Sequence, residues 1–200
     1  MRQIQLVGPV DKRPIAYSLF KLCDTMGKTL VITDDANFRR FADNYENEFT
    51  LGRSDFMIVN DISQELISSL DIKLNSYDYV IYINTNDLID KNDCLVYCHG
   101  QSELICTEDT LDFLEGTEHF EILISAKKPS DKNKNKSAEK SALFLAVDVK
   151  NFGYVWECEE NKMFMPCKSA ELGKLCTHMF ATPLSVPAEE ITKILAKEVQ

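Results

Sequence analysis

Glycine, proline and long hydrophobic runs are scarce in this sequence. Its 200 residues include 7 glycines and 6 prolines, which excludes collagen-like and low-complexity chains. No apolar run approaches the roughly 18 to 20 residues that a membrane helix needs, so we expect no membrane insertion. The first residues lack an apolar segment followed by a cleavage site, so we expect a cytoplasmic location.

Zinc-type ligand pairs are also lacking, although the chain has 7 cysteines. An odd number of widely spaced cysteines without an export signal indicates reduced thiols. Cys94, Cys98 and His99 form the one suggestive cluster, at a spacing that suits a helix face. Structural zinc sites have two close pairs of ligands, and no second pair follows here. We therefore expect small buried side chains and no metal, with a metal site at this cluster as the alternative.

Negative charge is concentrated in the middle of the chain. The net charge is −10 in total, −15 over residues 31–125, +3 over residues 1–30 and +4 over residues 126–140. A phosphate backbone requires clustered Lys and Arg, so we do not expect nucleic acid as a partner of the acidic block. Contact with nucleic acid or another anion remains an alternative for the two basic stretches.

The first 33 residues predict a strand, a helix and a second strand. The run Gln3 to Val7 is typical of a strand and ends at Gly8. Behind Pro14, apolar residues recur at helical period as far as Met26, and Gly27 is expected to adopt the left-handed conformation beyond the helix. The β-branched run 29–33 then predicts a buried strand. This order is a βαβ unit, whose crossover implies parallel strands.

The alternation continues along the chain. Further strands are expected at 56–59, 77–83, 103–106 and 120–125, and a hairpin of strands at 142–149 and 154–157. Further helices are expected at 37–44, from 61 or 63 to 70, and at 89–97, 107–115 and 187–197.

These elements predict one domain over residues 1–200. The fold class is α/β, with three layers and a mainly parallel, doubly wound sheet that carries helices on both faces. The segment 127–140 is rich in lysine and has no apolar anchor, so we expect an exposed loop there.

The loop Gly8 to Pro14 stands where an α/β sheet holds a phosphate-binding loop. A working loop reads G-x-x-x-x-G-K-[ST], because its glycines free backbone N–H groups, its Lys neutralises phosphate and its hydroxyl binds Mg²⁺. Gly8 matches the first glycine. Arg13, Pro14 and Ile15 replace the second glycine, the lysine and the hydroxyl residue.

The order of elements and the run Tyr-Asp-Tyr-Val-Ile-Tyr-Ile at 77–83 resemble the ParA/MinD-like branch of the P-loop NTPases. The resemblance covers residues 1–125, and the rest more loosely. It implies a P-loop-like fold with a degenerate Walker A motif. It also implies that Asn84 stands where the family has a metal-associated acid. The anion- or nucleotide-binding candidates are Gly8, Lys12, Arg13, Asp34, Asp35 and Asn84.

Two functions follow from this reading. Relatives act in partition, cell-division placement and the positioning of pili or secretion machines, often as dimers. The losses at 13–15 and at Asn84 favour a non-catalytic scaffold or adaptor for a protein partner, without a cofactor and with no catalytic residues. The alternative is a nucleotide-binding switch or ATPase in which Lys12 or Arg13 replaces the missing lysine.

Overall fold

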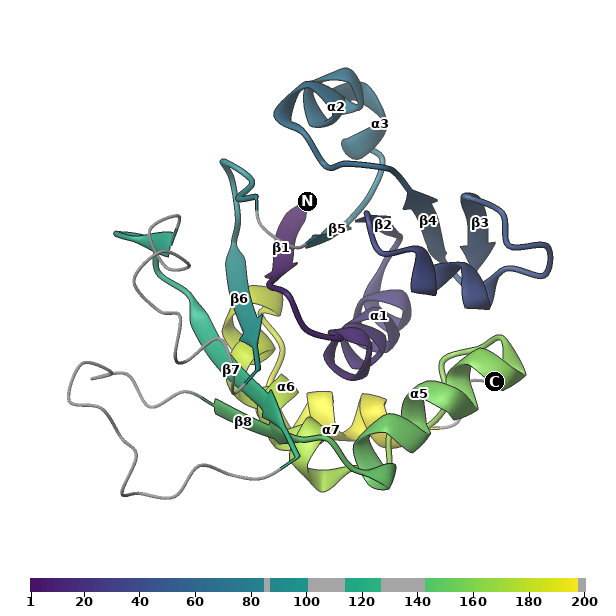
Figure 1. Ribbon diagram of the computed structural model, residues 1–200, viewed down its shortest axis with the longest axis vertical. Helices are drawn as coiled ribbons and strands as arrows, with labels where there is room; N and C mark the ends of the chain where they lie inside the picture. The colour runs from purple at the N-terminus through teal and green to yellow at the C-terminus, as the bar shows by residue number, and fades with distance from the viewer. Residues whose placement is uncertain (85–86, 101–113, 127–142, 198–200) are drawn as a thin grey trace.

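The described residues form a sheet of eight strands with helices on both faces (Figure 1). The computed structural model describes residues 1–84, 87–100, 114–126 and 143–197. The strands are β1 (Arg2–Val7), β2 (Thr29–Thr33), β3 (Glu48–Leu51), β4 (Ser54–Ile58), β5 (Tyr79–Asn84), β6 (Cys94–His99), β7 (Phe120–Ser125) and β8 (Leu143–Ala146). The helices are α1 (Arg13–Met26), the 3-10 helix η1 (Ala36–Phe41), α2 (Gln64–Ser69), α3 (Asp71–Leu74), α5 (Val149–Asn161), α6 (Ala170–Leu184) and α7 (Ala188–Ala196).

The strand order confirms the predicted mainly parallel sheet. The strands run β3-β4-β2-β5-β1-β6-β7-β8 across the sheet. Every neighbouring pair is parallel except β3 and β4, which form an antiparallel pair at one edge. The order is that of a doubly wound sheet. From β1 the chain builds β2, β4 and β3 towards one edge, then returns to β5 beside β1 and builds β6, β7 and β8 towards the other edge.

Alternate residues of each central strand face two different layers of helices. Ile4 and Leu6 of β1 lie in the larger core, which includes side chains of α1, α5, α6 and α7. Leu30 of β2 and Tyr82 of β5 lie in the smaller core with side chains of α2 and α3. The three predicted layers are therefore present, and both faces of the central strands are buried.

Helix α1 confirms the first predicted helix and lies at the centre of the larger core. All residues from Pro14 to Cys23 are buried. Gly27 ends the helix, but its φ of −171° is extended rather than left-handed, so that part of the prediction is wrong. A Cβ on Gly27 would lie 2.6 Å from Asp78 Oδ2. The glycine is thus needed for a close approach between two chain segments.

Residues 94–99 form strand β6, so the helix predicted at 89–97 is wrong. Cys94 and Cys98 share the face of the larger core, whereas His99 follows the other parity and stacks on Tyr97 with ring centroids 5.4 Å apart. The two cysteines are four residues apart, which suits one face of a helix. It also suits one face of a strand, because strand residues separated by an even number of positions share a face. The cluster therefore does not point its three side chains at one position.

Residues 154–157 lie in helix α5, so the predicted hairpin is wrong. Asp148 caps this helix by accepting a hydrogen bond from the Asn151 N–H at 2.9 Å. Tyr154, Val155 and Cys158 are buried on one side of it. Aromatic and β-branched residues favour strands in isolation, but the cap and the core contacts select the helix. Helix α6 was not predicted.

Other predicted elements have mixed outcomes. Strands β4, β5, β7 and β8 and helices α2 and α7 are confirmed, and the helix predicted at 37–44 is the 3-10 helix η1. The strand at 103–106, almost all of the helix at 107–115 and the whole of the loop at 127–140 lie outside the described residues. In the described part of the chain, no helix combines the length and the apolar composition of a membrane span.

Lys21 of α1 forms hydrogen bonds to the C-terminal end of helix α7. Its side chain is 2% exposed. Its Nζ donates to the carbonyl oxygens of Met165 at 2.9 Å, Leu195 at 3.1 Å and Lys197 at 2.5 Å. Burial lowers the pKa of Lys21 to about 8. Two of the three carbonyl groups lie at the end of α7, where unpaired carbonyl groups favour a cation.

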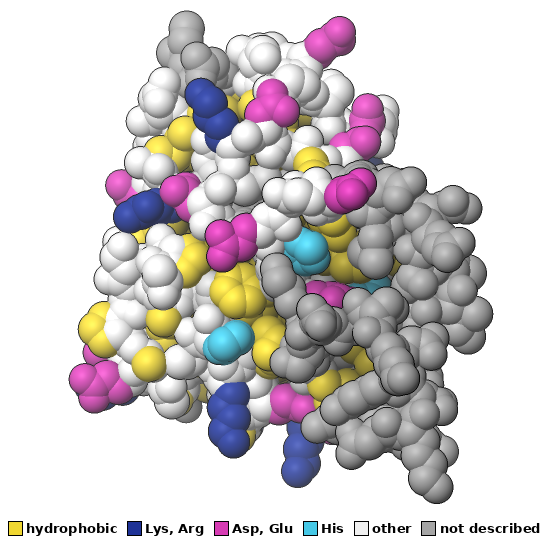
Figure 2. Space-filling view, turned by 90° about the vertical axis from the view of Figure 1, so that its left-hand side faces the viewer, with side chains coloured by type: hydrophobic (Ala, Val, Ile, Leu, Met, Phe, Trp, Pro, Cys, Tyr) yellow, Lys and Arg dark blue, Asp and Glu magenta, His cyan; other side chains and the backbone are white. Residues whose placement is uncertain are grey.

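Acidic side chains are scattered over one face of the molecule. On the face shown in Figure 2, where β6, β7 and β8 lie, the described acidic side chains stand among neutral side chains and do not form one patch. On this face the distribution agrees with a solvated surface.

Candidate functional site

The candidate site lies where the carboxyl ends of β1, β2 and β5 meet. The Gly8 N–H donates to the carbonyl oxygen of Asn84 at 3.2 Å, and the Asp34 N–H donates to that of Ile83 at 3.3 Å. These backbone bonds join the loop after β1 to the ends of the next two strands in the sheet. The three segments that the sequence proposed as parts of one site therefore converge.

Gly8 permits the chain to leave β1 at a sharp angle. Its φ is +131°, a value that residues with a side chain rarely adopt. A Cβ at this position would overlap the backbone carbonyl oxygen of Cys98 in β6. Gly8 is therefore required by the geometry of the loop, whatever the loop binds.

Lys12 bends back onto its own loop. Its side chain is 5% exposed, and its Nζ donates to the carbonyl oxygens of Gly8 at 2.5 Å and Val10 at 3.2 Å. Burial lowers the pKa of Lys12, while Cys98 and nearby carboxylates act in the opposite direction. The one lysine of the loop thus places its ammonium group among backbone carbonyl groups of the loop itself.

Asp11 occupies the start of helix α1. Its Oδ1 accepts hydrogen bonds from the backbone N–H and the Nε of Arg13, both at 3.0 Å. A helix N-terminus with free N–H groups is a natural anion site. In this chain an internal carboxylate binds there, and these hydrogen bonds lower the pKa of Asp11 against the opposing effect of burial.

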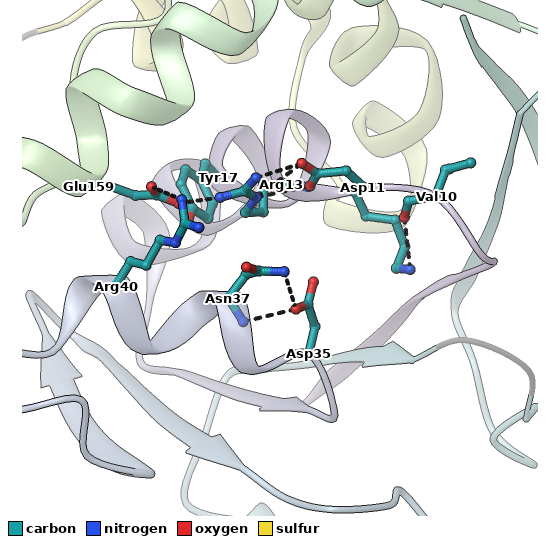
Figure 3. Close-up of polar contacts among 9 residues, drawn as sticks. Val10, Asp11, Arg13, Tyr17, Asp35, Asn37, Arg40 and Glu159 are labelled. Carbon is teal, nitrogen blue, oxygen red and sulfur yellow. Dashed lines mark hydrogen bonds and ion pairs between the residues drawn. The ribbon is translucent and has the colours of Figure 1, made fainter.

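Arg13 is held between two carboxylates (Figure 3). Its Nη2 lies 2.7 Å from Asp11 Oδ2, and its Nη1 lies 2.8 Å from Glu159 Oε1. Glu159 also accepts a hydrogen bond from the buried Tyr17 hydroxyl at 2.7 Å and contacts Arg40 at 3.4 Å. Burial opposes the charge of Arg13, but its carboxylate partners raise its pKa above the ordinary value.

A pocket of about 470 Å³ opens beside the loop. Asp35 at its wall is the N-cap of η1 and accepts hydrogen bonds at Oδ1 from the backbone and side-chain nitrogens of Asn37 (Figure 3). The pocket is lined by Pro9, Val10, Asp11, Lys12, Asp34, Asp35, Ala36, Asn37 and Asn60.

The side chain of Asn84 lies on the other face of the sheet. Its Oδ1 accepts a hydrogen bond from Gln5 Nε2 at 2.7 Å, and its Nδ2 donates to the carbonyl oxygen of Asp87 at 2.6 Å. Asn84 shares the parity of Tyr82, which faces α2 and α3. Ile83 is the residue of β5 that faces α1. Asn84 thus points its side chain away from the loop.

The chemistry of this site differs from that of a phosphate-binding loop. Three carboxylates and one engaged lysine line the pocket, so its field disfavours a polyphosphate. Ile15, which stands where a hydroxyl residue would bind Mg²⁺, is fully buried. Among the described residues, no group of His, Cys, Asp or Glu has the arrangement of a metal site.

Sequence reasoning missed two residues that shape the site. Asp11 stands two residues before Arg13, the first residue of α1, and its side chain accepts from the Arg13 N–H; Asp residues often make such local hydrogen bonds to the backbone two residues on. Glu159 is 146 residues away from Arg13 in the chain. No local pattern links them, and residues 154–157 of α5, just before Glu159, were expected to form a strand.

Comparison with known proteins finds solved structures of similar fold. No protein-family model and no curated protein matches the sequence. A chain of the MinC:MinD cell division protein complex from Aquifex aeolicus matches with a TM-score of 0.59 and 12% identity, over 86% of this chain and 93% of that chain. A putative plasmid partition protein from Borrelia burgdorferi, bound to AMPPNP, matches with a TM-score of 0.55 and 12% identity, over 97% and 98% of the two chains.

A further solved structure, apo McdA from Cyanthece, matches with a TM-score of 0.50 and 14% identity, over 98% of this chain and all of that one. These matches extend over most of each chain. The chain therefore has the ParA/MinD-like fold that the order of its elements predicted.

Proposed function

We propose that this chain, which has a ParA/MinD-like fold, is a non-catalytic scaffold or adaptor that binds a protein partner in the cytoplasm. The observation that carries the proposal is the internal neutralisation of the loop. Lys12 donates to the carbonyl groups of Gly8 and Val10. Arg13 is paired with Asp11 and Glu159. Both bases that would bind a phosphate are thus already engaged.

Catalysis of phosphoryl transfer fits this site poorly. That reaction depends on a cation and a metal ion placed around the transferred group. Arg13, Pro14 and Ile15 replace the glycine, the lysine and the hydroxyl residue. Rebuilding the cation site would mean breaking the pair between Arg13 and Glu159, whose side chains are 11% and 10% exposed. Breaking such a pair without a replacement costs several kcal/mol, about 3 to 5.

The structural neighbours supply a context for the scaffold. They include a chain of a cell-division complex and a putative plasmid partition protein. A degenerate member of this fold would serve as an accessory protein in a partition, positioning, or secretion or pilus system. The charge of −15 over residues 31–125 favours a protein rather than a nucleic acid as its partner.

A nucleotide-dependent switch is the second candidate. The observation that favours it is the pocket beside the loop, which has Lys12 in its wall; the three carboxylates of the pocket oppose it. One structural neighbour with this fold is bound to AMPPNP. In this candidate, a nucleotide would draw Lys12 out of the loop and into the pocket.

Thermal unfolding with and without nucleotide distinguishes the two. A ligand at 100 times its dissociation constant stabilises the folded state by about 2.7 kcal/mol, which shifts the melting temperature by several degrees. The scaffold proposal predicts no shift with millimolar ATP, ADP or GTP and Mg²⁺. A shift with one nucleotide that is absent with the others would favour the switch. Inorganic pyrophosphate serves as the control for a general salt effect.

A further inference from the structure

Helix α5 carries large hydrophobic side chains on its solvent-exposed side. Val149 is 77% exposed and Trp156 is 55% exposed. Val147 and Met163, just before and just after the helix, are also exposed. Exposed hydrophobic side chains that gather in one place mark interaction surfaces. Figure 1 shows α5 at the outside of the helical layer that covers α1.

One face of α5 carries a line of residues with the exposed Val149, Trp156 and Glu160 and the half-buried Gly153. Along the chain, Val149, Gly153, Trp156 and Glu160 are spaced by four, three and four residues, which places them on one face. The buried residues Asn151, Tyr154 and Cys158 lie on the opposite face. A Cβ on Gly153 would meet only Val149 Cγ1, at 4.0 Å. Gly153 therefore leaves a shallow gap in the line, where another backbone can approach closely.

The charges beside this line run against the dipole of the helix. Lys150 lies in the first turn of α5, and Glu157 and Glu160 lie near its end. A helix is stabilised by acids at its start and by bases at its end, so this order is unfavourable within one molecule. It becomes favourable when the start of one helix meets the end of another. Two antiparallel copies of α5 satisfy that condition.

We propose that a second copy of this chain docks on α5, antiparallel and about a two-fold axis that passes beside Gly153. Lys150 and Glu157 lie on the same flank of the helix, three residues before and four residues after Gly153. With a rise of about 1.5 Å per residue, the symmetry brings Lys150 to within about 1.5 Å, along the axis, of Glu157 of the partner subunit. The contact occurs twice.

The same symmetry pairs the hydrophobic residues. Val149 stands four residues before Gly153, and Trp156 stands three residues after it. Each Trp156 therefore packs beside Val149 of the partner subunit, and the two Gly153 backbones meet at the centre. Glu157 already lies 3.7 Å from Lys168 within its own chain, but that lysine side chain is 78% exposed. A pair exposed to this degree exchanges its partner at little cost.

One helix from each side is a small interface. Stable interfaces bury about 1,200 to 2,000 Å² in total, and a single helix pair falls at or below the lower limit. The dimer is therefore reversible and depends on protein concentration. It also leaves the pocket beside the loop accessible, so it is independent of the proposed scaffold function and of nucleotide binding.

Tryptophan fluorescence tests the dimer directly, because Trp156 is the only tryptophan in the sequence. The full chain is measured over a concentration series from 0.1 µM to 1 mM, chosen to span about four decades in dissociation constant. Burial of Trp156 between two copies shifts its emission to shorter wavelength as concentration rises. Sedimentation velocity on the same samples measures the fraction of dimer.

Charge reversal tests the register. Lys150→Glu and Glu157→Lys each create two like-charge contacts in the dimer, and each weakens association by about tenfold. The double variant K150E/E157K restores the opposite-charge contacts and recovers dimerisation. Lys193→Glu reverses an exposed charge on α7 and serves as the control, since it leaves the association unchanged. All three positions are at the surface, and circular dichroism checks that each of the four variants is folded.

Three results would overturn the inference. The first is a monomer with unshifted tryptophan emission at every concentration, which would leave α5 to a different partner. The second is a dimer whose strength the α5 variants do not change, which would place the interface elsewhere. The third is a dimer that both single variants weaken and the double variant does not recover, which would contradict the antiparallel register.

Discussion

Arg13 at the start of α1 and Glu159 near the end of α5 form a nearly buried ion pair, with Nη1 and Oε1 2.8 Å apart. The pair joins the loop after β1 to a helix from the opposite end of the sequence. This one contact couples the packing of α5 against α1 to the internal neutralisation on which the proposed scaffold function rests.

Replacing Glu159 tests the structural weight of this pair. Glu159→Ala leaves Arg13 with Asp11 as its one remaining carboxylate partner of the two and removes the acceptor of the Tyr17 hydroxyl. We expect the free energy of unfolding to fall by about 3 kcal/mol, because a nearly buried guanidinium loses one of its two partners and a buried hydroxyl loses its acceptor. Urea unfolding measures the change. The matched control is Glu160→Ala on the exposed side of the same helix, with a change within about 0.5 kcal/mol. Equal effects of the two substitutions would show that the pair contributes no more than a surface carboxylate.

Gly8 gives a second test of the loop. Gly8→Ala places a Cβ against the carbonyl oxygen of Cys98 at a φ of +131°. We expect a loss of more than about 3 kcal/mol, since the strain and the overlap add. Gly173→Ala in α6 is the control, because nothing lies within 4 Å of a Cβ there. That substitution raises stability by up to about 1 kcal/mol through helix propensity. Thermal melts of the two variants should therefore move in opposite directions, and a stable Gly8→Ala protein would refute this geometry.

The pH dependence of stability should report on Lys21. Burial lowers its pKa in the folded chain to about 8, below its ordinary value of 10.5. Between these two values the unfolded chain holds a proton that the folded chain has released, so the contribution of Lys21 to stability rises with pH. Lys21→Met removes this dependence. The difference in free energy of unfolding between wild type and variant should grow in favour of wild type from pH 8 to pH 10.5.

Comparing two chains is necessary in this pH range because buried thiols and phenols titrate there with the opposite sign. Their raised pKa values reduce the stability of both proteins equally as pH rises. A constant difference between wild type and Lys21→Met would show that Lys21 titrates normally.

The cysteines should be unreactive in the folded protein. All six described cysteines are free and buried, and burial raises the pKa of Cys94 and Cys98 to about 12. A thiol must ionise and be accessible to react. We expect Ellman's reagent to modify these six only after unfolding in guanidinium, where all 7 cysteines of the chain react. Rapid modification of two or more thiols in the native protein would contradict this burial.

The elements that the sequence predicted well are those whose local pattern and core contacts agree. Strand β5 and helix α1 are examples, because an apolar run or a helical stripe coincides with burial. Two predictions had the wrong type of element: a helix was predicted where β6 lies, and a strand was predicted within α5. Cysteines four residues apart fit a helix or a strand, and the aromatic residues of α5 favour a strand until the cap at Asp148 and the core decide.

The candidate site shows the same division. The position of the loop follows from a strand that ends in Gly8 and a helix with Pro14 near its start, and both are local signals. Asn84 is two residues after Tyr82 in β5, so the two side chains lie on the same face of the sheet. The direction of the Asn84 side chain can therefore be predicted once the strand is known. The contact with Glu159 had no such signal, since it depends on how α5 packs against α1.

Isothermal titration calorimetry with Mg²⁺ and ATP, ADP or GTP tests the central claim most directly. The internal neutralisation of Lys12 and Arg13 predicts no heat beyond dilution for any of the three nucleotides. Micromolar binding of one nucleotide, lost in Lys12→Ala, would contradict the scaffold and establish the switch.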